Sequence, residues 1–74
     1  MIEDFSIVTV HGNYEAYVEN FIKILDFGTD MIKIKATKVI VEFLGQNLYI
    51  EFMTKENLKV CGQIENIKFT EVLS

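Results

Sequence analysis

Few side chains in this 74-residue sequence are suited to chemistry, since it holds one histidine, His11, and one cysteine, Cys61. His11 could act as an acid or base near neutral pH, where an imidazole titrates. Cys61, with Lys59 on the same side of a strand, could be a nucleophile if positive charge lowered its pKa. No residue near His11 in the sequence forms a nucleophile–base pair with it. We therefore favour a histidine at a strand end or turn, and a half-buried structural cysteine.

Carboxylates are the other candidates for chemistry. They could pair for acid–base work or bind a hard cation. The residues concerned are Asp26, Asp30, Glu51, Glu56 and Glu65. Because they alternate with apolar residues, the sequence favours a solvated face instead. A single histidine and a single cysteine also argue against a zinc site, and no glycine-rich phosphate loop is present. The sequence thus predicts a non-enzymatic protein with no catalytic residues, no cofactor and no metal site.

Composition limits the classes of partner. The chain has 11 acidic and 7 basic residues and a net charge of -4, whereas binding to nucleic acid relies on Lys and Arg neutralising phosphates. We therefore predict no nucleic-acid partner. No run of about eighteen apolar residues occurs, so no direct membrane insertion is expected. Met1 is followed by Ile2, Glu3 and Asp4, which lacks the basic start of a secretory signal and predicts a cytoplasmic protein.

The dominant pattern along the chain is an alternation of apolar and polar residues, which is typical of β-strands. It occurs in segments 5–10, 14–19, 32–35, 48–53, 58–61 and 67–70. Two further segments, 21–25 and 39–44, are apolar on both faces and need cover on both sides. We predict a single all-β domain over residues 1–74, an antiparallel meander of about seven or eight short strands curled into a small sandwich or barrel-like roll.

Two alternatives to this meander have support in the sequence. Residues 14–26 have a helix-like apolar spacing, with Asn13 as a possible cap. Their aromatic and β-branched residues, and a turn-like pair at Glu19 and Asn20, favour strands instead. The second alternative is a short β-solenoid, because the glycines are 16, 17 and 17 residues apart. They are Gly12, Gly28, Gly45 and Gly62.

A chain this short has a thin core, and its two-sided apolar strands exceed what that core can cover. We therefore expect a homo-oligomer or another protein partner to cover some of them. Aromatic and Met side chains near Gly45 suit a contact surface, although they are equally consistent with core. The predicted interaction residues are Val39, Val41, Phe43, Tyr49, Phe52 and Met53.

Four segments, in their order and spacing, resemble a known family. They read VENFIKIL at 18–25, IKI at 32–34, GQNLYI at 45–50 and LKVCGQIENIKF at 58–69. Over residues 9–71 the chain resembles the YabP/YqfC sporulation proteins of spore-forming Firmicutes. It departs from them at Ala36, Thr37 and Lys38, where family members usually carry a glycine in the turn.

This resemblance implies a role in endospore formation, in the cytoplasm of the mother cell or forespore. It implies an assembly or accessory factor that works beside a membrane-associated protein, and it implies no catalytic residue. The alternative from the residues is a small ligand- or nucleic-acid-binding β-barrel of the Sm-like or OB type.

Overall fold

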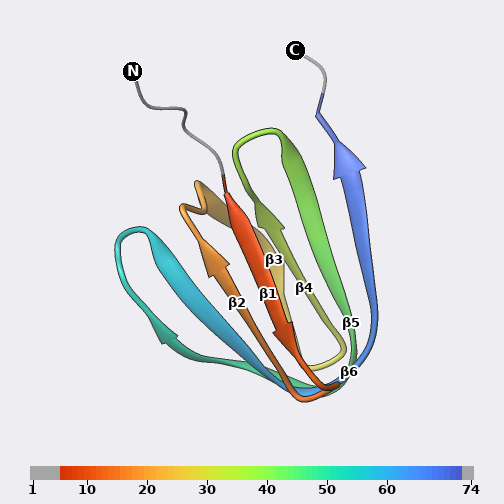
Figure 1. Cartoon of the computed structure of the whole chain (residues 1–74). Coiled ribbons are helices and arrows are strands. Elements are labelled where there is room, and N and C mark those ends of the chain that lie inside the picture. The colour runs from red at the N-terminus through yellow and green to blue at the C-terminus, as the bar shows by residue number, and fades with distance from the viewer. Residues whose placement is uncertain (1–5, 73–74) are drawn as a thin grey trace.

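The computed structural model describes residues 6–72, which form six β-strands in one antiparallel sheet (Figure 1). The strand order across the sheet is β1-β2-β6-β5-β4-β3. Their bounds are β1 (Ile7–His11), β2 (Glu15–Glu19), β3 (Lys23–Phe27), β4 (Met31–Lys35), β5 (Val39–Met53) and β6 (Asn57–Glu71). The all-β, antiparallel prediction is confirmed, but the sheet is not a simple meander, because β2 lies next to β6 and not next to β3.

Both alternatives to the meander are wrong. Residues 14–26 hold β2 and the start of β3 and no helix, and Asn20, which follows β2, has a φ of 62°, typical of a tight turn. A solenoid is excluded because every pairing is antiparallel. Phe5, placed in the first predicted strand, lies outside the described residues.

The prediction of seven or eight short strands is wrong in number, because four predicted segments join in pairs. Segments 39–44 and 48–53 are both part of β5, and segments 58–61 and 67–70 are both part of β6; each of these strands has 15 residues. The β5–β6 register shifts between Leu44 and Gly45 and between Gln46 and Tyr49. Bulges of this kind bend a strand without ending it. Gly45 and Gly62 therefore lie inside continuous strands.

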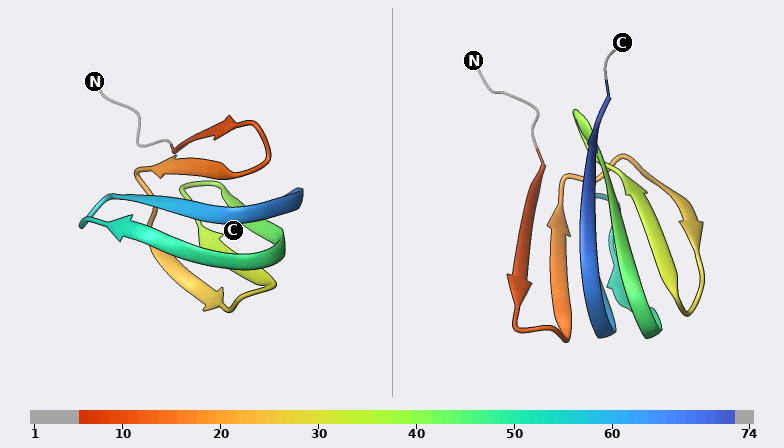
Figure 2. Two further views of the ribbon diagram at one scale, coloured as in Figure 1. Left: turned by 90° about the horizontal axis from the view of Figure 1, so that it is seen from below. Right: turned by 90° about the vertical axis from the view of Figure 1, so that its right-hand side faces the viewer.

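The bends give the sheet two halves, which are defined by strand pairing. The front half consists of β1, β2, residues 57–61 of β6 and residues 49–53 of β5. The rear half consists of β3, β4, residues 39–44 of β5 and residues 66–71 of β6. Figure 2 shows β1 and β2 on one side of the long β5–β6 hairpin and β4 and β3 on the other. The sheet curls but does not close, so the barrel-like part of the prediction is wrong, and the Sm-like or OB-type barrel has no support in this fold.

Each bend is held by the turn of a short hairpin. The turn between β1 and β2 accepts hydrogen bonds from the bend of β6, and the turn between β3 and β4 accepts them from the bend of β5. Backbone amides in irregular segments need such partners, because an unpaired buried amide is costly. The four bonds are Gly62 N to Tyr14 O (3.2 Å), Ile64 N to Asn13 O (2.8 Å), Gly45 N to Asp30 O (3.1 Å) and Leu48 N to Thr29 O (2.8 Å).

The core lies between the two halves. Phe43 is its largest fully buried side chain, and β2, β4 and β6 contribute aliphatic neighbours. These residues alternate along their strands with exposed or half-exposed ones, as the period-two pattern predicted. The core consists of Ala16, Val18, Ile32, Ile34, Ala36, Val41, Phe43, Leu48, Leu58, Val60 and Ile64.

Candidate functional site

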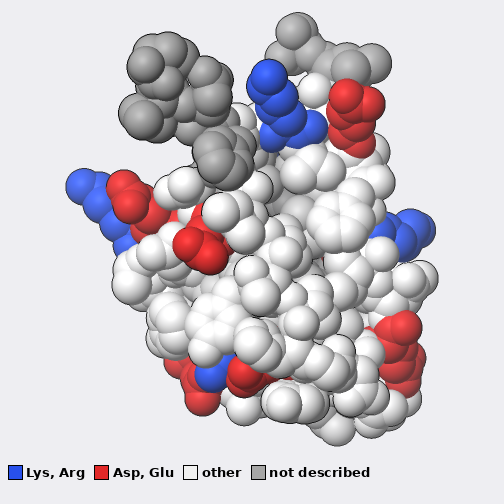
Figure 3. Space-filling view, viewed as in Figure 1, with Lys and Arg blue, Asp and Glu red and all other residues white. Residues whose placement is uncertain are grey.

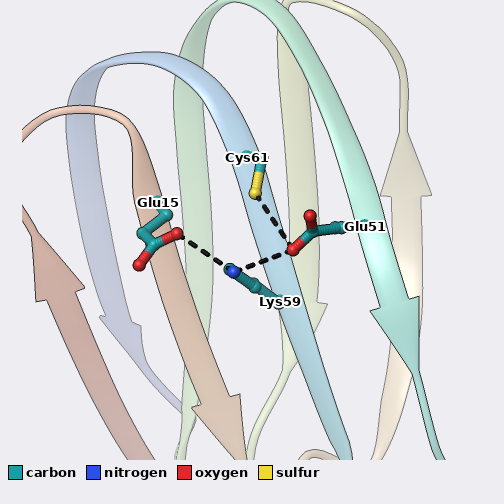
Figure 4. A network of polar contacts seen from close by, with 4 residues as sticks. All are labelled: Glu15, Glu51, Lys59 and Cys61. Atoms are coloured by element: carbon teal, nitrogen blue, oxygen red, sulfur yellow. Dashed lines mark hydrogen bonds and ion pairs between the residues drawn. The ribbon is translucent and has the colours of Figure 1, made fainter.

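The outer face of the front half carries a three-residue ion pair network centred on Lys59 (Figure 4). Its Nζ lies 3.1 Å from Oε1 of Glu15 on β2 and 2.8 Å from Oε1 of Glu51 on β5. The three strands are neighbours in the sheet, so the lysine bridges a carboxylate on either side. Lys59 is 15% exposed and Glu51 48%. The network therefore joins β2, β6 and β5 at the surface.

Aromatic rings surround this network. The ring of Tyr17 lies edge-on to His11, with 5.8 Å between centroids, and edge-on to Phe52, at 6.2 Å. The Lys59 ammonium sits 5.1 Å from the centre of the Tyr17 ring, within cation–π range. Edge-to-face ring pairs of this kind are favourable, so the rings add to the interactions that hold this surface together.

Glu51 and Lys59 stabilise each other's charged form. The hydrogen bond and positive charge of Lys59 lower the pKa of Glu51 below its ordinary value of 4.5, and hydrogen bonds to Glu51 and Glu15 raise the pKa of Lys59. A general acid or base works best when its pKa is near the working pH. Both shifts move away from neutrality, so this pair is suited to holding strands and not to transferring protons.

Replacing Lys59 by Met is expected to make the unfolding free energy depend less on pH in acid. Because the folded pKa of Glu51 lies below 4.5, its contribution is present above that pH and is lost as the pH falls through the folded value. The wild-type unfolding free energy should therefore decline below about pH 4.5 more steeply than that of Lys59→Met. Urea unfolding between pH 7 and pH 2 measures this, with Lys55→Met, in the turn after β5, as the control. Equal slopes for all three proteins would contradict the assignment.

Cys61 lies beside the network but is poorly placed to react. It is 7% exposed, and its Sγ lies 3.8 Å from Oε1 of Glu51. Burial, followed by the negative charge of Glu51, raises the pKa of the thiol. A thiol must ionise to act as a nucleophile, so this cysteine is mostly protonated at neutral pH. The structure supports the interpretation of Cys61 as a small buried side chain.

His11 ends β1 and contacts the ring of Tyr17, so it lies at a strand end as the sequence suggested. In the described part of the chain, no three His, Cys, Asp or Glu residues are grouped so that they could hold a metal ion. Of the five carboxylates considered for chemistry, Glu51 is in the Lys59 network, and Glu65 accepts hydrogen bonds from Gln46 and Gln63.

The predicted interaction residues fall into two groups. Val41 and Phe43 are fully buried and Val39 packs partly against the core, so these three stabilise the fold. A partner cannot contact the side chains of Val41 and Phe43 in this fold. The other three lie near the end of β5, where Tyr49 and Phe52 face outward and Met53 is on the opposite face. Their association with a partner stays a prediction. Tyr49 is 52% exposed, Phe52 43% and Met53 55%.

Sequence reasoning missed the exposed rings at the edges of the rear half. Phe27 on β3 is 64% exposed and Phe69 on β6 is 58% exposed. Phe69 belongs to a predicted strand segment and Phe27 lies two residues beyond one, but which strand forms an edge depends on the order in the sheet. Figure 3 shows mainly uncharged surface across the middle of the front view, with charged side chains towards the rim. Exposed apolar rings such as those of Phe27 and Phe69 are typical of protein-binding surfaces.

Within residues 6–72 there is no helix of the length and apolar character needed to cross a bilayer. Comparison with curated proteins and with solved structures gave no significant match. A model of the YabP family matches residues 4–74, all but the first three residues. This match confirms the resemblance noted from the four segments. The chain therefore belongs to the YabP family, a family of sporulation proteins.

Proposed function

We propose that this protein is a non-enzymatic assembly or accessory factor of sporulation, which acts by binding other protein chains. The observation that carries this proposal is a set of exposed apolar side chains at the end of β5, hereafter the β5 patch: Tyr49 and Phe52 on the outer face and Met53 on the opposite face. Among the described residues, this segment of β5 is paired on one side. Exposed aromatic and Met side chains beside a free strand edge support binding by strand addition or by packing on the sheet face.

The proposed partners are further copies of this chain and a membrane-associated protein of the same sporulation programme, met in the cytoplasm of the mother cell or forespore. Family membership supports the sporulation programme. The Lys59 network supports the binding role, because it fixes β5 next to β6 and so presents the β5 patch in one geometry. Preorganised surfaces of this kind bind at lower entropic cost.

Replacing Tyr49 by Lys tests the β5 patch. We expect the variant to capture its partner from sporulating cells at least about tenfold less well than the wild-type protein, because a charge would have to be buried in the contact. Ile22→Lys is the matched control, since Ile22 is 54% exposed and lies in the link between β2 and β3. Quantitative pull-down with equal amounts of folded bait measures the ratio. Equal capture by Tyr49→Lys and wild type would show that the β5 patch does not bind the partner.

A further inference from the structure

The rear half of the sheet ends in two open edges that run in opposite directions. Its strands follow in the order β6, β5, β4, β3, and each is antiparallel to the next, so β3 runs opposite to β6. Among the described residues, β3 pairs with β4 alone, and residues 66–71 of β6 pair with β5 alone. A second copy placed beside the first by simple translation would therefore bring β3 next to β6 in antiparallel orientation. Open edges of this kind are templates for strand pairing.

On both edges, the backbone N–H and C=O groups that face outward are spaced as antiparallel pairing requires. Gly28 N donates to Met31 O, so Gly28 and Met31 form a hydrogen-bonded pair. Hydrogen-bonded and non-hydrogen-bonded pairs alternate in an antiparallel ladder, so the next pair, Phe27 and Ile32, is not hydrogen-bonded. Phe27 therefore directs its N–H and C=O to the open edge. On β6, Val72 N donates to Lys38 O, so by the same alternation Glu71, Phe69 and Ile67 direct theirs to the other edge.

The side chains select one register. With Phe27 of one copy opposite Ile67 of the next, two apolar residues meet on the inner face, since their partners Ile32 and Phe43 are buried. The next pair is then Asp26 opposite Lys68 on the outer face. Phe69 of the second copy falls beside the bulge of β3 between Ile24 and Asp26, and there its exposed ring would be covered.

Charge on the outer face supports the same register. Asp26, Lys33, Glu42 and Lys68 are successive register partners across β3, β4, β5 and β6, so their charges alternate from one edge of the rear half to the other. One edge thus ends in an acidic side chain and the opposite edge in a basic one. Placing Lys68 beside Asp26 of the next copy continues the alternation, and opposite charges across a strand pair are stabilising.

We propose that copies of this chain join head to tail through β3 and β6, with Asp26 opposite Lys68, and form an open-ended chain of subunits with a continuous sheet. A heterologous contact that does not close on itself produces such a chain. This inference deepens the proposed function, on which it rests, by naming the second copy that binds these two edges. It does not involve the β5 patch.

The two registers of a two-fold dimer centred on Lys68 and Phe69 of β6 are less favourable. With the same amide phase, one register places Lys68 opposite Lys68 of the partner copy, and the next places Glu71 opposite Ile67 on the inner face. The first sets like charges against each other, and the second removes a carboxylate from water beside an apolar side chain. The unlike edges avoid both penalties.

A pair of charge reversals tests the register. Asp26→Lys has a lysine on both edges and Lys68→Asp has an aspartate on both, so neither should associate with itself. In an equimolar mixture each edge of one variant again meets an opposite charge, and assembly should return. Sedimentation from about 10 µM to about 1 mM, the range in which small interfaces associate, measures the average mass. The wild-type mass should rise without levelling off at two subunits, each variant should remain at 8.6 kDa, and the mixture should follow the wild type.

Circular dichroism of each variant confirms that it is folded before mixing. A wild-type protein that stays monomeric over this range, or levels off at a dimer, would overturn the head-to-tail chain. Failure of two folded variants to recover assembly when mixed would overturn the register. These outcomes are separable from the proposed function, because the pull-down with Tyr49→Lys reports on the β5 patch and the sedimentation of purified protein does not.

Discussion

A Gly62→Ala variant is expected to be strongly destabilised at 25 °C. Gly62 has a φ of +125°, and an added Cβ would meet the backbone of Asn47 and lie 2.8 Å from the Cα of Leu48. An L-residue is strained at this φ, and the facing atoms are backbone that cannot move aside. We expect a loss of at least about 3 kcal/mol of unfolding free energy, from a total of about 4–11 kcal/mol for a domain of this length.

The matched control is Gly28→Ala, measured by urea denaturation beside Gly62→Ala. A Cβ at Gly28 would meet atoms no closer than 3.9 Å, so we expect a change within about 1 kcal/mol. Gly45→Ala should behave like Gly62→Ala, since its Cβ would run into the backbone carbonyl of Gln63. If Gly62→Ala and Gly28→Ala are equally stable, the two bends do not require glycine and the bulged hairpin is incorrect.

Truncating Phe43 to Ala is expected to cost about 3–5 kcal/mol, because the ring is fully buried and its removal leaves a cavity in a thin core. Phe69→Ala removes the same ring at a position 58% exposed and should cost about 1 kcal/mol or less in dilute solution. Thermal and urea unfolding of both variants at low micromolar concentration gives the comparison. A cost for Phe43→Ala as small as that for Phe69→Ala would contradict the placement of the core between the two halves of the sheet.

Strand content could be predicted from the sequence, but strand continuity could not. The alternation of apolar and polar residues located the segments that became strands, because burial on one face selects every second side chain. The glycines at positions 45 and 62 could not be assigned, since a glycine suits both a turn and a bulge inside a strand. Hydrogen bonds from the two bends to the turns at residues 13–14 and 29–30 stabilise a bulge, and not a turn, at both glycines. These turns are distant from the glycines in sequence.

The candidate surfaces were predictable in part. Tyr49 and Met53 lie exposed as predicted, whereas strict alternation would place Phe52 on the same face as Leu48 and Ile50. The bulge between Ile50 and Phe52 shifts its ring to the outer face, against Tyr17. One extra residue reverses the direction of every later side chain. The ends of the charge row, Asp26 and Lys68, depend on strand order, which local patterns do not encode.

The most direct test of association between chains is amide hydrogen exchange followed by NMR at low and at high protein concentration. The amides of Phe27, Ile67 and Phe69 face the open edges, so they should exchange rapidly in dilute solution. At about 1 mM, where edge pairing is populated, we expect their protection to rise at least about tenfold, while that of Val41 in the core stays constant. Unchanged exchange at the three edge amides, under conditions in which the protein is folded, would contradict the account.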